Sequence, residues 1–115
     1  MTNSTSEITY ELTNVQQWLE AFPIMKQLRT DLTEEQYIEL IQDMSKDGYK
    51  LYAMYVDDKI VSLVGLSWRI NFYNKRHIFI YDLVTDISHR SFGYGEKLLK
   101  YIQEWAKENG AEYVA

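Results

Sequence analysis

The chain has 115 residues, of which 46% are hydrophobic and 15% aromatic, so it can bury the core of one small domain. Its net charge of −5 disfavours a nucleic-acid partner, because DNA binding depends on basic surface. It has no cysteine, which excludes disulfides and thiol catalysis, and two isolated histidines, His77 and His89, argue against a metal site. No apolar run approaches the ~20 residues of a membrane span, and the first residues lack a signal-peptide pattern. We therefore expect a cytoplasmic protein with neither a membrane nor a nucleic acid as partner.

The first half of the chain contains one strand pattern followed by two helix patterns. Apolar residues alternate over residues 8–12, which predicts a strand. A helical period begins at Asn14, and Pro23 should kink this helix or split it in two, because proline has no backbone N–H. Thr33 and Gln36 have the spacing of a capping box, which predicts the start of a second helix.

The second half of the chain changes to a period of two. Residues 50–56, 60–72 and 76–85 are predicted strands joined by short turns, which favours an antiparallel meander. An amphipathic helix is predicted over residues 96–109, and a last strand begins at residues 111–115. The order β-α-α-β-β-β-α-β predicts an α+β fold with a mixed, mainly antiparallel sheet and helices on its faces. The final β-α-β unit should be right-handed and parallel.

One stretch between a predicted strand and a predicted helix has the composition of an anion site. Its residues are Arg90, Ser91, Phe92, Gly93, Tyr94 and Gly95. The first N–H groups of a helix have no intrahelical partner, and glycines let a phosphate approach the backbone. An arginine just upstream can add a charge-assisted hydrogen bond. The stretch therefore favours a bound pyrophosphate, although two glycines spaced by one residue also occur in ordinary turns.

This order of elements, with Asp82-Leu-Val-Thr-Asp86 followed by His89-Arg-Ser-Phe-Gly-Tyr-Gly95, resembles the GNAT superfamily of N-acetyltransferases. The family signature is Arg or Gln, two residues, Gly, one residue, and Gly or Ala. It corresponds here to Arg90-x-x-Gly93-x-Gly95. The specific part of the match is residues 82–99, and the element order extends it over all 115 residues. The resemblance implies transfer of an acetyl group from acetyl-CoA to a primary amine of a small molecule or peptide.

The resemblance also implies where acetyl-CoA binds. Backbone amides of residues 90–95, next to Glu96 in the first turn of the helix, would hold the pyrophosphate. Backbone groups of Leu83, Val84 and Thr85 would hold the pantetheine arm like an extra strand. In the family, a bulge in the fourth strand splays it from the fifth and leaves those groups open.

The acetyl transfer further needs a base and a donor to the oxyanion. Asp82 is the best-placed carboxylate, because a regular strand would put it on one face with Ile78, Ile80 and Val84. Its alternative role is to tie down a neighbouring helix or loop. The backbone N–H of a strand residue such as Val84 is a candidate oxyanion donor.

Three further residues are candidates for contact with the amine acceptor. Arg29 and Asp31 lie between the first two helices, where the family often builds its acceptor wall, and Tyr81 lies beside Asp82. A solvated turn for Arg29 and Asp31, and core packing for Tyr81, are the alternatives.

The match departs from the family pattern at the end of the sequence. Family members continue past the fifth strand with a fourth helix and two strands, so residues 1–115 are expected to form a single domain without them. No tyrosine here corresponds to the family's usual general acid. An open edge on the fifth strand would invite a second copy and a homodimer. Two other functions stay open: a catalytically impaired CoA-binding or regulatory remnant, and a dimerising interaction module.

Overall fold

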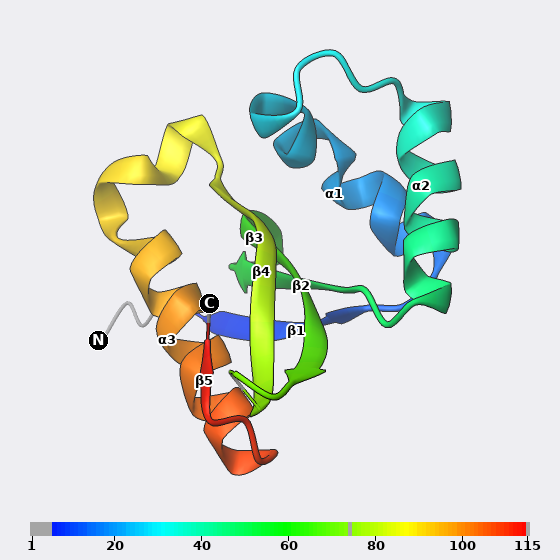
Figure 1. Cartoon of the computed structure of the whole chain (residues 1–115). Coiled ribbons are helices and arrows are strands. Elements are labelled where there is room, and N and C mark those ends of the chain that lie inside the picture. The colour runs from blue at the N-terminus through cyan, green and yellow to red at the C-terminus, as the bar shows by residue number, and fades with distance from the viewer. Residues whose placement is uncertain (1–5, 74, 115) are drawn as a thin grey trace, which may run out of the picture.

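The computed structural model describes residues 6–73 and 75–114 (Figure 1). The helices are α1 (Val15–Leu28), α2 (Glu34–Lys46) and α3 (Tyr94–Glu108), with a 3-10 helix η1 (Ile87–Phe92) before α3. The strands are β1 (Glu7–Leu12), β2 (Lys50–Val56), β3 (Lys59–Asn71), β4 (Lys75–Thr85) and β5 (Tyr113–Val114). Ala115, the last residue of the predicted final strand, lies outside the described residues. The element order and the α+β class predicted from the sequence are confirmed.

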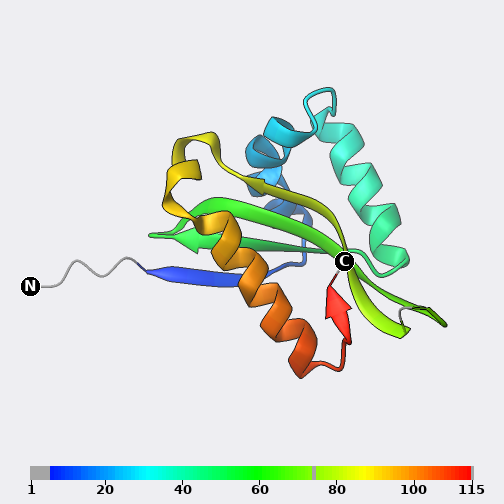
Figure 2. The same ribbon diagram turned by 60° about the vertical axis from the view of Figure 1, so that its left-hand side comes forward.

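The strands form one sheet in the order β1-β2-β3-β4-β5. The first four strands pair antiparallel, and β5 pairs parallel to β4. Helices α1 and α2 cover one face of the sheet and α3 covers the other (Figure 2). Strands β2 and β3 are therefore buried on both sides, which explains their nearly continuous apolar sequence.

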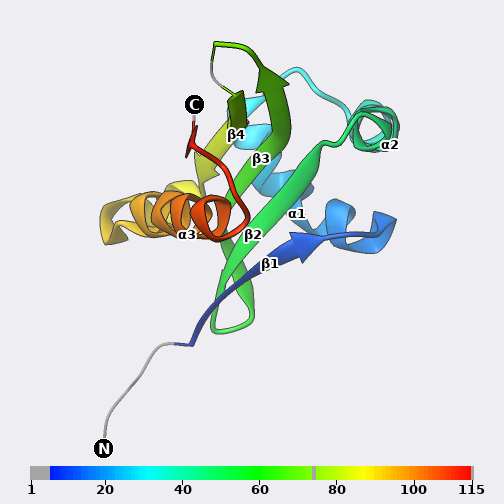
Figure 3. The same cartoon turned by 60° about the horizontal axis from the view of Figure 1, so that its bottom comes forward.

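Each face of the sheet has its own apolar core. Under α1 and α2, Ile24 and Ile41 pack with Leu63 of β3. On the other face, Leu98 and Ile102 of α3 pack against residues of the sheet, and both are fully buried. Figure 3 shows the sheet between these two helical layers, with β1 at its edge. None of the helices in residues 6–73 and 75–114 is long and apolar enough to cross a membrane.

The predicted starts of the first two helices are observed, whereas Pro23 does not split the first helix in two. The Asn14 side chain caps α1, and both hydrogen bonds of the Thr33–Gln36 capping box are present at the start of α2. Helix α1 runs without interruption through Pro23. The apolar face of α1 is buried on both sides of this proline, and that packing outweighs the hydrogen bond that proline cannot make.

Strand β4 contains one extra residue relative to β3. Gly65 pairs with Asp82, but its neighbour Leu66 pairs with Ile80, which leaves Tyr81 without an opposite residue on β3. This is the register shift of a β-bulge. The bulge lies in the fourth strand, as the resemblance to the family implied.

The bulge reverses the faces of the strand residues that follow it. Ile78 and Ile80 pack in the core under α3, whereas Val84 packs in the core under α1 and α2. Asp82 lies on the α1–α2 face with Val84. The prediction that all four residues share one face is therefore wrong, because it assumed an uninterrupted period of two.

Beyond its first residues, β4 has an open side. Within the described residues, β5 pairs with β4 at His77 and Ile78, well before the bulge. The rest of β4, up to Thr85, continues past the end of β5 (Figure 1). A homodimer through the edge of the fifth strand stays a prediction.

Candidate functional site

The connection from β4 to α3 is itself helical, which sequence reasoning missed. The 3-10 helix η1 runs up to Phe92, Gly93 follows with φ of +75°, and α3 begins at Tyr94, two residues before its predicted start. A positive φ of this size favours glycine, so Gly93 makes the turn between the two helices. No side chain caps α3. The first N–H groups of this helix therefore have no side-chain partner, and their role in binding an anion stays a prediction.

A cavity of about 460 Å³ lies between the end of β4, η1 and the start of α3. We call it the loop cavity. It is lined by Leu83, Val84, Thr85, Arg90, Gly93, Gly95, Glu96 and Leu99. The first seven of these are among the predicted cofactor-binding residues. Of the other three, Ser91 and Phe92 are exposed, and the rings of Phe92 and Tyr94 contact one another at 5.7 Å.

Gly95 lets α3 start close to the end of β4. A Cβ atom at this position would lie 2.9 Å from the Thr85 hydroxyl, nearer than such atoms normally approach. A Cβ atom at Gly93 would point into open space, with none of the described non-neighbouring residues within 4 Å. The two glycines thus serve different ends: Gly95 provides close packing, and Gly93 provides the positive φ beside open space.

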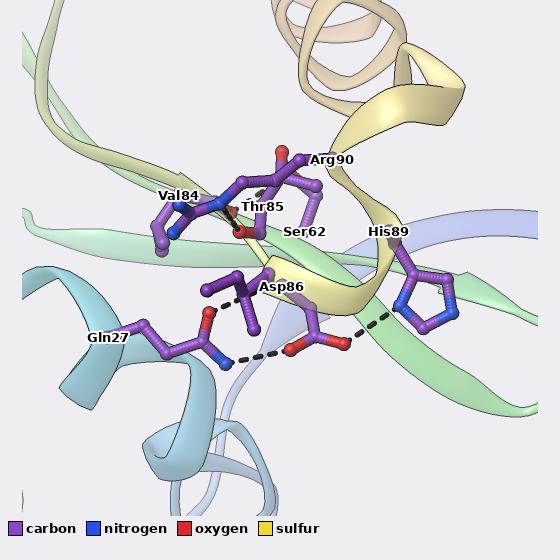
Figure 4. A network of polar contacts seen from close by, with 8 residues as sticks. Gln27, Ser62, Val84, Thr85, Asp86, His89 and Arg90 are labelled. Carbon is purple, nitrogen blue, oxygen red and sulfur yellow. Dashed lines mark hydrogen bonds and ion pairs between the residues drawn. The ribbon is translucent and has the colours of Figure 1, made fainter.

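The backbone N–H and C=O groups at the end of β4 point alternately toward β3 and toward the side of the loop cavity. The Val84 carbonyl accepts a hydrogen bond from the Ser62 hydroxyl of β3 (Figure 4). The Asp86 N–H donates to the Val61 carbonyl of β3. Because successive residues of a strand alternate, the groups of Leu83 and Thr85 point away from β3. The Val84 N–H, suggested from the sequence as an oxyanion donor, is thus on the β3 side. Leu83 and Thr85 are the residues whose N–H groups face the open side.

Arg90 is held at this strand end by a hydrogen bond. Its Nε donates to the Thr85 carbonyl at 3.0 Å, on the side away from β3 (Figure 4). The guanidinium group therefore lies at the wall of the loop cavity, where it can add positive charge to an anion site.

A glutamine of α1 clamps the start of η1 (Figure 4). The Nε2 of Gln27 donates to Asp86 at 2.7 Å, and its Oε1 accepts from the Ile87 N–H at 2.8 Å. The other Asp86 oxygen pairs with His89 at 2.8 Å. The hydrogen bond from Gln27, followed by that from His89, lowers the pKa of Asp86. Nothing in the sequence pattern singles out Gln27, because its partners lie about sixty residues away.

Asp82 is the centre of a second polar network. Arg29, at the end of α1, donates from Nε and Nη2 to one Asp82 oxygen at 3.0 and 2.7 Å. The Tyr49 hydroxyl donates to the other oxygen at 3.0 Å. Burial, and then the Asp82 charge, raises the pKa of Tyr49, so this hydroxyl keeps its proton. Asp82 therefore ties α1 and the start of β2 to β4, and its role as a base stays a prediction.

Tyr49 reaches Asp82 because a glycine lies beneath it. A Cβ atom at Gly65 would overlap the Tyr49 hydroxyl. Gly65 is also the residue that pairs with Asp82 across the sheet. Sequence analysis missed both residues, since their contact joins the residue before β2 to β3 and no local motif marks either one.

A second cavity, of about 310 Å³, opens between α1, α2 and β4. We call it the helix cavity. Arg29, Asp31, Tyr81 and Asp82 all contribute to its lining, so the structure brings the predicted acceptor residues together. The Tyr81 hydroxyl accepts hydrogen bonds from Ser67 and Arg69, which lower the pKa of this group.

The class of protein follows from a comparison with known families. The model of the acetyltransferase (GNAT) family matches residues 12–115. The chain therefore belongs to the GNAT acetyltransferase family.

Individual relatives agree with this assignment. The chain is 38% identical over 106 residues to a Bacillus subtilis (strain 168) protein named uncharacterized N-acetyltransferase YhdJ, covering 91% of this chain and 75% of that one. A GNAT family acetyltransferase from Staphylococcus aureus is similar in structure, with a TM-score of 0.83, 20% identity, and coverage of 95% and 84%. The aminoglycoside N-acetyltransferase AAC(6')-Iy, solved in complex with CoA, has a TM-score of 0.81, 16% identity, and coverage of 100% and 78%.

The contact between Tyr49 and Gly65 makes a stability prediction. We expect Gly65→Ala to lower the free energy of unfolding by about 1–3 kcal/mol, because the added methyl group overpacks against the tyrosine. Ser67→Ala, two residues along β3, should cost less, because its hydrogen bond to Tyr81 is long at 3.5 Å. Urea unfolding of both variants measures the difference. An unchanged free energy for Gly65→Ala would contradict the prediction.

The lowered pKa of Asp86 makes a prediction about pH. A carboxyl whose pKa is lower in the folded state adds stability above its unfolded pKa, here near the ordinary value of 3.8, and loses it as the pH falls further. The natural chain should therefore have a higher melting temperature than Asp86→Asn at neutral pH. This difference in melting temperature should narrow below about pH 4. Asp58→Asn, in the exposed β2–β3 turn, serves as the control and should show no such narrowing. A gap for Asp86→Asn that stays constant across this range would contradict the assignment.

Proposed function

We propose that the chain transfers the acetyl group of acetyl-CoA to the nitrogen of a primary amine. The observation that carries this proposal is the meeting of the two cavities on consecutive residues of β4. Tyr81 and Asp82 line the helix cavity, and Leu83, Val84 and Thr85 line the loop cavity. A donor in one cavity and an acceptor in the other would approach each other at the bulge, and membership of the family supports this chemistry.

The loop cavity suits the CoA part of the donor. The uncapped start of α3 and the open space at Gly93 suit a pyrophosphate, with Arg90 at the wall. The open side of β4 suits the amides of a pantetheine arm, which would pair with the backbone of Leu83 and Thr85. Glu96, the one acidic side chain in this lining, suits the positive end of the α3 dipole.

The reaction itself needs little covalent chemistry from the protein. The amine nitrogen attacks the thioester carbonyl carbon, the C–S bond breaks, and the amine proton is released as the CoA thiolate leaves and is protonated. Asp82 accepts the amine proton directly or through a water molecule. A carboxylate has about four lone-pair sites, so hydrogen bonds from Arg29 and Tyr49 leave room for an amine donor. An N–H on the open side of β4 stabilises the oxyanion.

The donor half of the proposal is tested by a change at Gly93. We expect Gly93→Asp to weaken acetyl-CoA binding by at least about tenfold, because it strains the turn and puts a negative charge beside the phosphates. Gly110→Asp is the matched control: Gly110 also has a positive φ, of +92°, but follows the far end of α3. Calorimetry with acetyl-CoA compares the two variants. Equal losses, or none in either variant, would overturn the pyrophosphate site.

The catalytic half is tested at Asp82. We expect Asp82→Asn to lower kcat for acetylation of amines by about 10²–10⁴-fold. Acetyl-CoA affinity should stay close to that of the natural chain, since Asp82 lies outside the loop cavity lining. Arg29→Gln breaks the same tether but keeps the carboxylate, so it should cost much less in kcat. Equal losses of kcat in both variants would show that Asp82 acts only by holding Arg29. If the natural chain binds acetyl-CoA tightly but acetylates no amine, the alternative of a catalytically impaired CoA-binding protein is favoured.

A further inference from the structure

The wall of the helix cavity is mostly apolar. Five aliphatic and thioether side chains from α1, α2 and the connection between them contribute to it: Met25, Leu32, Leu40, Ile41 and Met44. Thioether side chains adapt their shape to what they contact, which suits a wall that receives a ligand.

The hydroxyl groups of the three tyrosines in the wall already have hydrogen-bond partners within the protein. Tyr37 donates to the Trp18 carbonyl at 2.7 Å, Tyr49 donates to Asp82, and Tyr81 accepts from Arg69. Each of these hydroxyls therefore already uses part of its hydrogen-bonding capacity within the protein. A ligand rich in hydroxyls would find few partners in this part of the cavity to replace its hydrogen bonds to water.

The charged groups in the wall favour a single cation. The described residues that line the cavity include one cation, Arg29, and two carboxylates, Asp31 and Asp82. Arg29 is paired with Asp82 at 2.7 Å, so the three groups together carry a net charge of −1. Asp82 immediately precedes Leu83, the first residue of β4 that lines the loop cavity, and Asp31 lies on the exposed connection between α1 and α2.

The size of the cavity limits what fits. About 310 Å³ is at the lower end of the range for sites that hold small ligands. At its rim Leu40 is 47% exposed, an apolar side chain turned to solvent beside the opening. Covering this apolar surface with a ligand would lower the free energy of the complex.

We propose that the acceptor of this acetyltransferase is a small primary amine carried on an apolar body, such as an aryl or alkyl group, and not an amino sugar or a polyamine. The inference rests on the proposed function for the transfer step and on the helix cavity for binding. The ammonium or amine group lies at Asp82, and the apolar body lies against Met25, Leu40 and Met44. An amino sugar lacks the apolar body, and a polyamine brings more cations than the cavity has free carboxylates.

The methionines allow binding to be measured without catalysis. With methyl-¹³C-methionine labelling, Met25 and Met44 report on the helix cavity, and Met54, in the core under α3, is an internal control. On titration with 2-phenylethylamine we expect saturable shifts of the Met25 and Met44 signals and none of Met54. Glucosamine, spermidine and 2-phenylethanol should each bind at least about tenfold more weakly. Equal or tighter binding of glucosamine or spermidine, or no shift with 2-phenylethylamine, would overturn the inference.

Product analysis with the same compounds separates this inference from the proposed function. Binding of 2-phenylethylamine without any acetylated product would overturn the transfer reaction and leave the ligand class standing. Acetylation of glucosamine or spermidine in preference to 2-phenylethylamine would overturn the ligand class and leave the transfer reaction standing.

A pair of leucine variants tests the placement of the apolar body. Leu40→Asn should weaken binding of 2-phenylethylamine by at least about threefold, with little change in acetyl-CoA affinity. Leu19→Asn is the control, because Leu19 is also an exposed leucine of this helical layer, at 37%, and lies outside the helix cavity lining. Equal effects of the two variants would place the apolar body elsewhere.

Discussion

The extra residue in β4 is the constraint on which the rest of the site depends. Without the bulge at Tyr81, the alternation of the strand would keep Asp82 on the face of Ile80, inside the apolar core under α3. A carboxylate buried there would have to be neutralised or paired. With the bulge, Tyr81 and Asp82 both line the helix cavity, and the backbone groups of Leu83 and Thr85 face the loop cavity side. Because of this one inserted residue, two different cavities are lined by consecutive residues of the same strand.

A glycine on the neighbouring strand completes this arrangement. Gly65 pairs with Asp82 in the sheet and leaves the space that the Tyr49 hydroxyl occupies. Tyr49 and Arg29 then satisfy both oxygens of the carboxylate, whose side chain is 10% exposed. Because the hydroxyl stays protonated and the guanidinium stays charged, the carboxylate is held in one orientation with spare acceptor capacity. That is the arrangement that a positioned proton acceptor needs.

The parts of this structure that the sequence predicted depend on local signals. The change from a helical period to a period of two, the Thr33–Gln36 spacing and the two glycines at the start of α3 each report on neighbours within a few residues. The parts that it missed depend on contacts across the chain. No local pattern distinguishes a bulged β4 from a regular strand, so the face of Ile80 was assigned correctly relative to Ile78 but wrongly relative to Asp82. Gln27 and Tyr49 were missed for the same reason, since their partners belong to other elements.

The last turn of α1 connects the two halves of the site. Gln27 holds the start of η1 beside the loop cavity, and two residues later Arg29 holds Asp82 beside the helix cavity. Helix α1 is anchored to the sheet by Ala21, Ile24 and Met25, so both contacts are made from a rigid base. Bimolecular transfer between a thioester and an amine depends on holding the reacting atoms within roughly 3–3.5 Å in a fixed direction. The end of α1, from Gln27 to its C-cap Arg29, contacts both walls and so sets their separation directly.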